Sequence, residues 1–169
     1  MNSGISWEVV IYPSLLLVDA LFDHDASTSA QSRSSWLLSI TLASAATAMA
    51  ATAWDTLTDP MAVHVGYWKW DNGGAFLPEV HHGIPFSNFW GWLGATFLIS
   101  FVYRCFSERA RHAVANHASG PLFAVLMYTG LFLGAQSGLR ANGLYSASFL
   151  GVFTMGPLVV LAWCRYFRQ

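Results

Sequence analysis

Two aspartates near the middle of the chain have the residue type and the spacing that acid–base chemistry needs. Asp55 and Asp59 lie four residues apart in the run WDTLTDP, residues 54–60, at the end of an apolar stretch. Residues four apart share one face of a helix, and charged groups inside a membrane helix are costly and are usually functional or paired. We therefore expect a buried carboxylate pair. The alternative is that Asp59 ends the helix before Pro60 while Asp55 reaches the membrane surface.

A buried carboxylate pair indicates general acid–base catalysis. Two carboxyl groups held close together cannot easily both ionise, so one of them keeps its proton at neutral pH. A proton donor then lies beside a proton acceptor, which suits protonation of an unactivated alkene and capture of the resulting cation by water. We expect Asp55 to donate the proton and Asp59 to accept one from the water, although the two could exchange roles.

Aromatic residues around the acid pair are candidates for contacts with a substrate. Trp54 directly precedes Asp55, and Tyr67, Trp68 and Trp70 follow the pair. The faces of aromatic rings stabilise cations, and they can also stack on extended polyenes. The alternative for these residues is a belt of aromatic side chains at the membrane surface, which is common in membrane proteins.

The first apolar segment of the chain carries a second set of acids. Glu8, Tyr12, Leu15 and Asp19 follow the helical period and therefore share one face of a helix. We expect Glu8 and Asp19 to face the same cavity as the acid pair. Alternatively, both acids reach water near the two ends of the segment.

Asn88 opens another apolar segment, in the run FSNF. An asparagine at this position could cap the helix that begins there. Its amide could instead hydrogen-bond a carboxylate or hold a water molecule, and the sequence leaves both roles open.

Histidines in the middle of the chain raise the question of a metal site. His81 and His82 follow Asp71 and Glu79 within a short stretch. Membrane di-iron hydroxylases and desaturases need several histidine-rich boxes at helical spacing, and this chain has none. We therefore expect no metal ligands among these residues.

The composition indicates an integral membrane protein rather than a soluble domain. Hydrophobic residues make up 54% of the 169 residues and charged residues only 10%, against roughly 25% charged residues in typical soluble domains. The net charge of −1 implies no basic surface for nucleic acid. Cys105 and Cys164 match no zinc or redox spacing, and we expect both to be reduced. The oligomeric state stays open.

The distribution of apolar residues predicts a bundle of membrane helices. Crossing a bilayer takes about 20 mostly apolar residues. We expect an all-α polytopic bundle that forms one domain over residues 1–169, with five spans at about 5–22, 35–58, 86–106, 120–139 and 144–165. The second span is rich in Ala, Ser and Thr, and small residues let membrane helices approach closely. This span should therefore be central.

The connections between spans differ in character. Residues 59–85 are rich in aromatic residues, glycine and proline, so we expect this loop to fold back into the mouth of the bundle or to lie at the membrane surface. Basic residues follow the third and the fifth predicted spans, and such residues favour the cytoplasmic side. We therefore expect the C-terminus in the cytoplasm and the N-terminus outside.

Four blocks of sequence resemble the carotenoid biosynthesis protein family, which includes carotenoid 1,2-hydratases such as the bisanhydrobacterioruberin hydratases. The blocks are residues 54–60, GYWKW at 66–70, the glycine pair at 73–74 and GIPFSNFWGW at 83–92. The resemblance implies a polytopic membrane enzyme of carotenoid or related isoprenoid metabolism that needs no redox cofactor. Its hydratase members add water across the terminal double bond of an acyclic end group. The motif positions that carry over are Asp55, Asp59, Trp68, Trp70, Pro85, Asn88 and Trp92.

Together these features give the hypothesis of a cofactor-independent membrane hydratase. It would protonate the terminal alkene of a long polyisoprenoid or carotenoid, with Trp54, Trp68 or Trp70 near the cation and with water held by Asp59 and Asn88. Two alternatives stay open. One is a membrane-bound isoprenoid cyclase or isomerase that uses the same protonation, and the other is a non-catalytic pigment-binding subunit.

Overall fold

The computed structural model describes residues 3–22, 33–67, 69–70, 83–106 and 120–168. Within these residues every regular element is a helix, which confirms the all-α prediction. The helices are α1 (Ser3–Phe22), α2 (Arg33–His64), α4 (Phe86–Phe106), α6 (Gly120–Ala141), α7 (Tyr145–Thr154) and α8 (Gly156–Tyr166).

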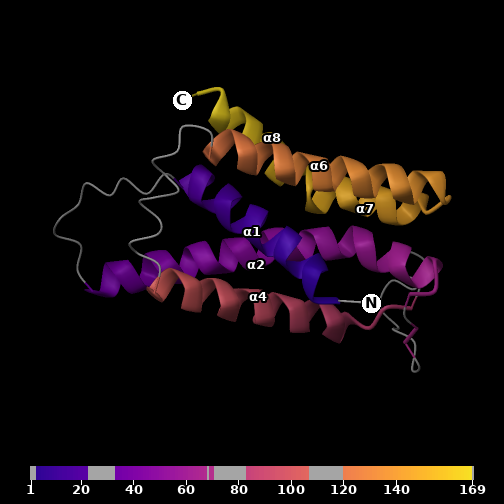
Figure 1. Cartoon of the computed structure of the whole chain (residues 1–169), viewed down its shortest axis with the longest axis horizontal. Helices are drawn as coiled ribbons and strands as arrows, with labels where there is room; N and C mark the ends of the chain where they lie inside the picture. Colours follow the sequence, from indigo (N-terminus) through magenta and orange to yellow (C-terminus); the bar gives the residue numbers. More distant parts are fainter. Residues whose placement is uncertain (1–2, 23–32, 68, 71–82, 107–119, 169) are drawn as a thin grey trace.

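The long helices lie side by side along the longest axis of the molecule, and they alternate in direction (Figure 1). α2 packs against α1, α4, α6 and α7, which agrees with the central position predicted for it. Its buried residues are mostly small, as in Ala43, Ser44, Thr47 and Ala51. Because small side chains let neighbouring backbones come close, α2 can serve as the packing surface for four other helices.

Three helices are long and apolar enough to cross a membrane: α2, α4 and the part of α6 from Pro121 to Ala141. α7 and α8 together make a fourth candidate span, which is broken. α1 forms as predicted for residues 5–22, and Val9–Phe22, the stretch whose side chains are described, is apolar but shorter than the candidate spans. The described part of the chain therefore holds three or four candidate spans, and the five-span count stays a prediction.

α2 continues past the point where the sequence predicted its end. We expected the helix to stop at residue 58, before Pro60, but it runs through Pro60 to His64. Its end is set by Gly66, whose φ of 74° is left-handed. The Tyr67 N–H donates to the Ala62 carbonyl at 2.8 Å and the Gly66 N–H donates to the Val63 carbonyl at 3.1 Å. This bonding pattern is a Schellman motif, and it satisfies carbonyls of the last turn.

The predicted span at 144–165 is two helices rather than one. α7 and α8 meet at Met155 with a bend of 40°. Pro157 lies in the first turn of α8 and has no N–H to donate to the Phe153 carbonyl, and in a continuous helix its ring would clash with that carbonyl. The proline therefore favours the break, which apolar composition alone did not predict.

The hydrophobic core lies where α1, α2, α6, α7 and α8 meet. It is built around wholly buried side chains such as Leu17, Leu57, Leu139 and Met155. Tyr128 is also wholly buried, and its hydroxyl donates to the Ala50 carbonyl at 2.8 Å. The tyrosine can lie inside the core because its one polar group has a partner.

Candidate active site

Asp55 and Asp59 lie on one face of α2, and each is only 2% exposed. Neither carboxyl group reaches the surface of the bundle, so the alternative of an exposed helix end is wrong. α2 also does not stop at Asp59, since the helix continues to His64. The two acids are therefore one helical turn apart inside a continuous helix.

Asn88 joins the two acids through its side-chain amide. The Asn88 Nδ2 group donates to Asp55 Oδ2 at 3.2 Å and also donates to Asp59 Oδ2. The residue lies in the first turn of α4, and its position there brings α4 against the face of α2 that carries the acids. Of the two roles that the sequence left open, the contact with carboxylates is the one observed.

α7 contacts the turn of α2 between the two acids on the side opposite to α4. The Thr56 hydroxyl lies 3.0 Å from the Thr154 hydroxyl, so the two are hydrogen-bonded. Leu57 packs so tightly on Gly151 that a Cβ atom at that glycine would lie 2.7 Å from the leucine side chain. The acids therefore project toward α4 from a turn that α7 fixes in place.

The aromatic residues predicted to surround the acids lie in different places. Trp54 is partly buried and packs against the hydrophobic core. Tyr67 is 68% exposed, and Trp70 is partly buried. Trp92 is partly buried and lies one turn after Asn88 on α4. Trp68 lies outside the described residues.

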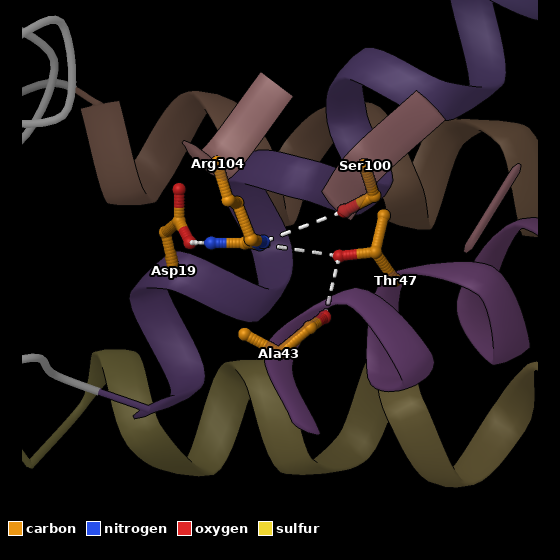
Figure 2. A network of polar contacts seen from close by, with 5 residues as sticks. All are labelled: Asp19, Ala43, Thr47, Ser100 and Arg104. Atoms are coloured by element: carbon orange, nitrogen blue, oxygen red, sulfur yellow. Dashed lines mark hydrogen bonds and ion pairs between the residues drawn. The ribbon is translucent and has the colours of Figure 1, made fainter. Parts of the chain in front are cut away.

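Asp19, on the predicted acidic face of α1, does not join this site. Asp19 pairs instead with Arg104 of α4, with Oδ1 and the guanidinium nitrogen 2.5 Å apart (Figure 2). Spacing along α1 predicted a shared face but not the direction of that face relative to α2. The side chain of Glu8 lies outside the part of α1 whose side chains are described.

Arg104 is the functional candidate that the sequence did not reveal. Its guanidinium is wholly buried and contacts three helices (Figure 2). Besides Asp19 on α1, it donates to the Thr47 hydroxyl at 3.2 Å and to the Ser100 hydroxyl at 3.4 Å. The Thr47 hydroxyl in turn donates to the Ala43 carbonyl at 2.9 Å. These contacts compensate a charge that would otherwise be very costly inside an apolar bundle.

A pattern in α4 could have revealed Arg104. Polar or amphipathic residues recur every four positions along this helix, at Asn88, Trp92, Thr96, Ser100 and Arg104. The last three are wholly buried. Such a stripe on an otherwise apolar helix predicts a buried polar face that ends in a charge.

The remaining chemical candidates are few within the described ranges. No group of three or more His, Cys, Asp or Glu side chains that could hold a metal ion occurs there. Asp71, Glu79, His81 and His82 lie outside those ranges. Cys105 and Cys164 are free thiols, as predicted.

Two of the cavities that described residues line do not include Asp55 or Asp59. One is very small, and the other is a groove of about 420 Å³ between α1, α2 and α8. The acid pair lies against α4, which contributes no residue to this groove. The acid pair and the groove are therefore separate features of the bundle.

The family profile described as "carotenoid biosynthesis protein" matches residues 3–158 of the chain. The chain belongs to the carotenoid biosynthesis protein family. No curated protein and no solved structure matches it. As a member of this family, the chain has a role in carotenoid biosynthesis, which implies an enzyme with a carotenoid or isoprenoid substrate. Its apolar helices are those of an integral membrane protein.

The residues that define the site all fall within the matched range. Asp55, Asp59 and Asn88 lie there, and so do both partners of the Asp19–Arg104 ion pair. The similarity to the family is therefore not limited to four short blocks but extends over most of the chain.

Proposed function

We propose that this carotenoid biosynthesis protein is a hydratase, which protonates the terminal alkene of a long isoprenoid and adds water to the cation. The observation that carries the proposal is the pair of buried carboxyl groups, Asp55 and Asp59, bonded to one amide of Asn88. Family membership supplies the substrate class. The site supplies a donor and an acceptor of protons.

The contacts of the pair support an arrangement with one shared proton. Both carboxyl groups reach the same Asn88 nitrogen, so their oxygen atoms lie close together. Two negative charges at such a distance, away from water, are strongly unfavourable, and a single proton on the pair relieves them. The amide has two N–H groups and can donate to each carboxyl group whichever one carries the proton.

The proposed reaction needs only these groups, an alkene and a water molecule. The protonated carboxyl of Asp55 gives its proton to the terminal double bond, and a tertiary cation forms on the neighbouring carbon. The oxygen of water bonds to this carbon while Asp59 takes up the released proton. Transfer of that proton between the adjacent carboxyl groups restores Asp55. General acid–base steps of this kind contribute roughly 10²–10⁴-fold each.

Burial of the pair also favours a second candidate function. Asp55 and Asp59 are each 2% exposed, so water reaches them only sparingly. A cation formed in such a site could instead lose a proton or close a ring, as in an isoprenoid cyclase or isomerase. Asn88 favours hydration, because an amide beside the acids can hold the attacking water.

Product mass after expression in a carotenoid-producing host separates these functions. A hydratase gives a product heavier by one water molecule, whereas a cyclase or isomerase gives a product of unchanged mass. A bound pigment without any conversion would identify a pigment-binding subunit and refute both catalytic proposals.

Three substitutions test the assignment of the acids. We expect Asp55→Asn and Asp59→Asn each to lower product formation by at least about 10²-fold, because each removes one partner of the proton transfer. Thr58→Val is the matched control, since Thr58 lies between the acids on α2 and its hydroxyl bonds only the Trp54 carbonyl at 3.2 Å. Equal amounts of each variant in the membrane must be verified by immunoblot. Wild-type turnover in either Asn variant would refute the mechanism.

A further inference from the structure

The groove between α1, α2 and α8 is a feature of the bundle that the proposed chemistry does not use. Its volume of about 420 Å³ lies within the roughly 300–1,000 Å³ typical of small-molecule sites. Its walls are apolar and include Leu21 and Phe22 of α1, Met49 of α2 and Leu161 of α8. Phe22, Met49 and Leu161 are each more than half exposed, so the groove opens on the outer surface of the bundle. In a membrane this surface faces lipid.

Two arginines line one end of the groove. Arg165 lies in the last turn of α8 and Arg168 follows just after it, and both line the groove. The two are three residues apart, and this spacing puts both side chains on the same side of the chain end. Arg168 is exposed and Arg165 is partly buried. The apolar groove is therefore lined by two arginines from the end of α8.

This combination of features indicates the chemistry of the ligand. A guanidinium group matches phosphate oxygens with paired hydrogen bonds, and basic pockets between membrane helices bind anionic lipid head groups. A pure hydrocarbon such as a carotene would gain nothing from two cations. We propose that the groove binds an anionic phospholipid, with one acyl chain between α1, α2 and α8 and with the phosphate at Arg165 and Arg168.

Lipid binding to the purified protein tests this proposal without any reliance on its enzymatic activity. The protein is exchanged into micelles that contain equal amounts of phosphatidylglycerol and phosphatidylcholine, and the retained lipid is measured by native mass spectrometry. We expect the wild-type protein to retain the anionic lipid with a preference of roughly tenfold or more. The variant with both Arg165→Gln and Arg168→Gln should lose that preference.

Two further variants make the result specific to the groove. Arg33→Gln removes an exposed arginine at the same end of the bundle but outside the groove, so it should keep the preference. Leu161→Trp narrows the groove while leaving both arginines, so it should lower the retention of phosphatidylglycerol. Circular dichroism must show unchanged helix content in every variant.

Several results would overturn the proposal. Equal retention of both lipids by the wild-type protein would do so, and so would an unchanged preference in the double arginine variant. Retention of an uncharged carotene, equally strong in wild type and double variant, would identify the groove as a hydrocarbon site instead. Because the measurement involves neither Asp55 nor Asp59, failure of the hydratase proposal leaves its outcome unaffected.

Discussion

Arg104 is a charged residue that is wholly buried among the described helices. Its side chain is wholly buried in α4, a helix apolar enough to cross a membrane, and Asp19 is its ionic partner. The aspartate is different, since its side chain is 35% exposed. The two members of this ion pair should therefore respond unequally to substitution.

We expect Asp19→Ala to destabilise the protein more than Arg104→Leu does. Loss of the aspartate leaves a buried cation unpaired, which typically costs about 3–5 kcal/mol. Loss of the arginine leaves the Asp19 carboxylate, which can reach water. The leucine that replaces Arg104 is an apolar side chain in apolar surroundings. Unfolding by heat or by SDS in detergent micelles measures both effects.

The double variant is the control for this experiment. Asp19→Ala combined with Arg104→Leu removes both charges, so it should regain part of the stability that Asp19→Ala alone loses. Equal losses for the two single variants, or a double variant that loses their sum, would contradict the proposed role of the ion pair.

The same residues show how far sequence reasoning reaches. Asp55 and Asp59 were predicted to share a buried face because two residues of one helix fix their own geometry. Asn88 was placed among possible partners because its position at a helix start left few roles for it. Asp19 was assigned to the wrong site, since its partner Arg104 is 85 positions away and spacing within α1 does not reveal how the helix is rotated.

At the level of helices, the close contact between α7 and α2 depends on Gly151. We expect Gly151→Ala to destabilise the protein by about 1–3 kcal/mol, because the added Cβ would lie 2.7 Å from the Leu57 side chain and force the helices apart. Gly134→Ala on α6 is the control. Nothing lies within 4 Å of a Cβ there, so the change should be neutral or stabilising by up to about 1 kcal/mol.

Thermal unfolding of both glycine variants in the same detergent checks this prediction. A Gly151→Ala protein as stable as the Gly134→Ala protein would mean that α7 can move away from α2 without cost. The tight packing described for the turn between the two acids would then not hold.

Sequence patterns predicted the existence of the helices better than their ends. Apolar runs predicted α4 at its observed bounds of 86–106 because such runs are long and uninterrupted. The end of α2 differs from the prediction because Pro60 does not stop the helix, which ends before Gly66. The break at Met155 was missed because an apolar run continues across it.

At the level of the whole molecule, the positions of the basic residues indicate how the bundle lies across the membrane. The beginning of α1 and the end of α8 lie toward opposite ends of the bundle (Figure 1). Arg165 and Arg168 lie at the same end as the last turn of α4, which carries Arg104. Basic residues favour the cytoplasmic side, so this end should be cytoplasmic.

We expect epitope tags at the two termini to lie on opposite sides of the membrane, with the C-terminal tag in the cytoplasm. This result follows if α1 crosses the membrane as a fifth span. Protease accessibility in intact cells and in inverted vesicles measures it. Both tags on one side would show that α1 packs within the bundle without crossing, and the predicted five-span arrangement would be wrong.

The hydroxyl bond between Thr56 and Thr154 has a consequence for how the bundle responds to its surroundings. Thr154 is the last residue of α7, directly before the break at Met155, and Thr56 lies between Asp55 and Asp59. A bilayer thicker or thinner than the protein is accommodated by tilting or kinking of its helices, and a broken helix yields most easily at its break. Any such adjustment reaches the turn that carries both carboxyl groups through this hydrogen bond and through the contact of Leu57 with Gly151, so the proposed chemistry should depend on membrane thickness.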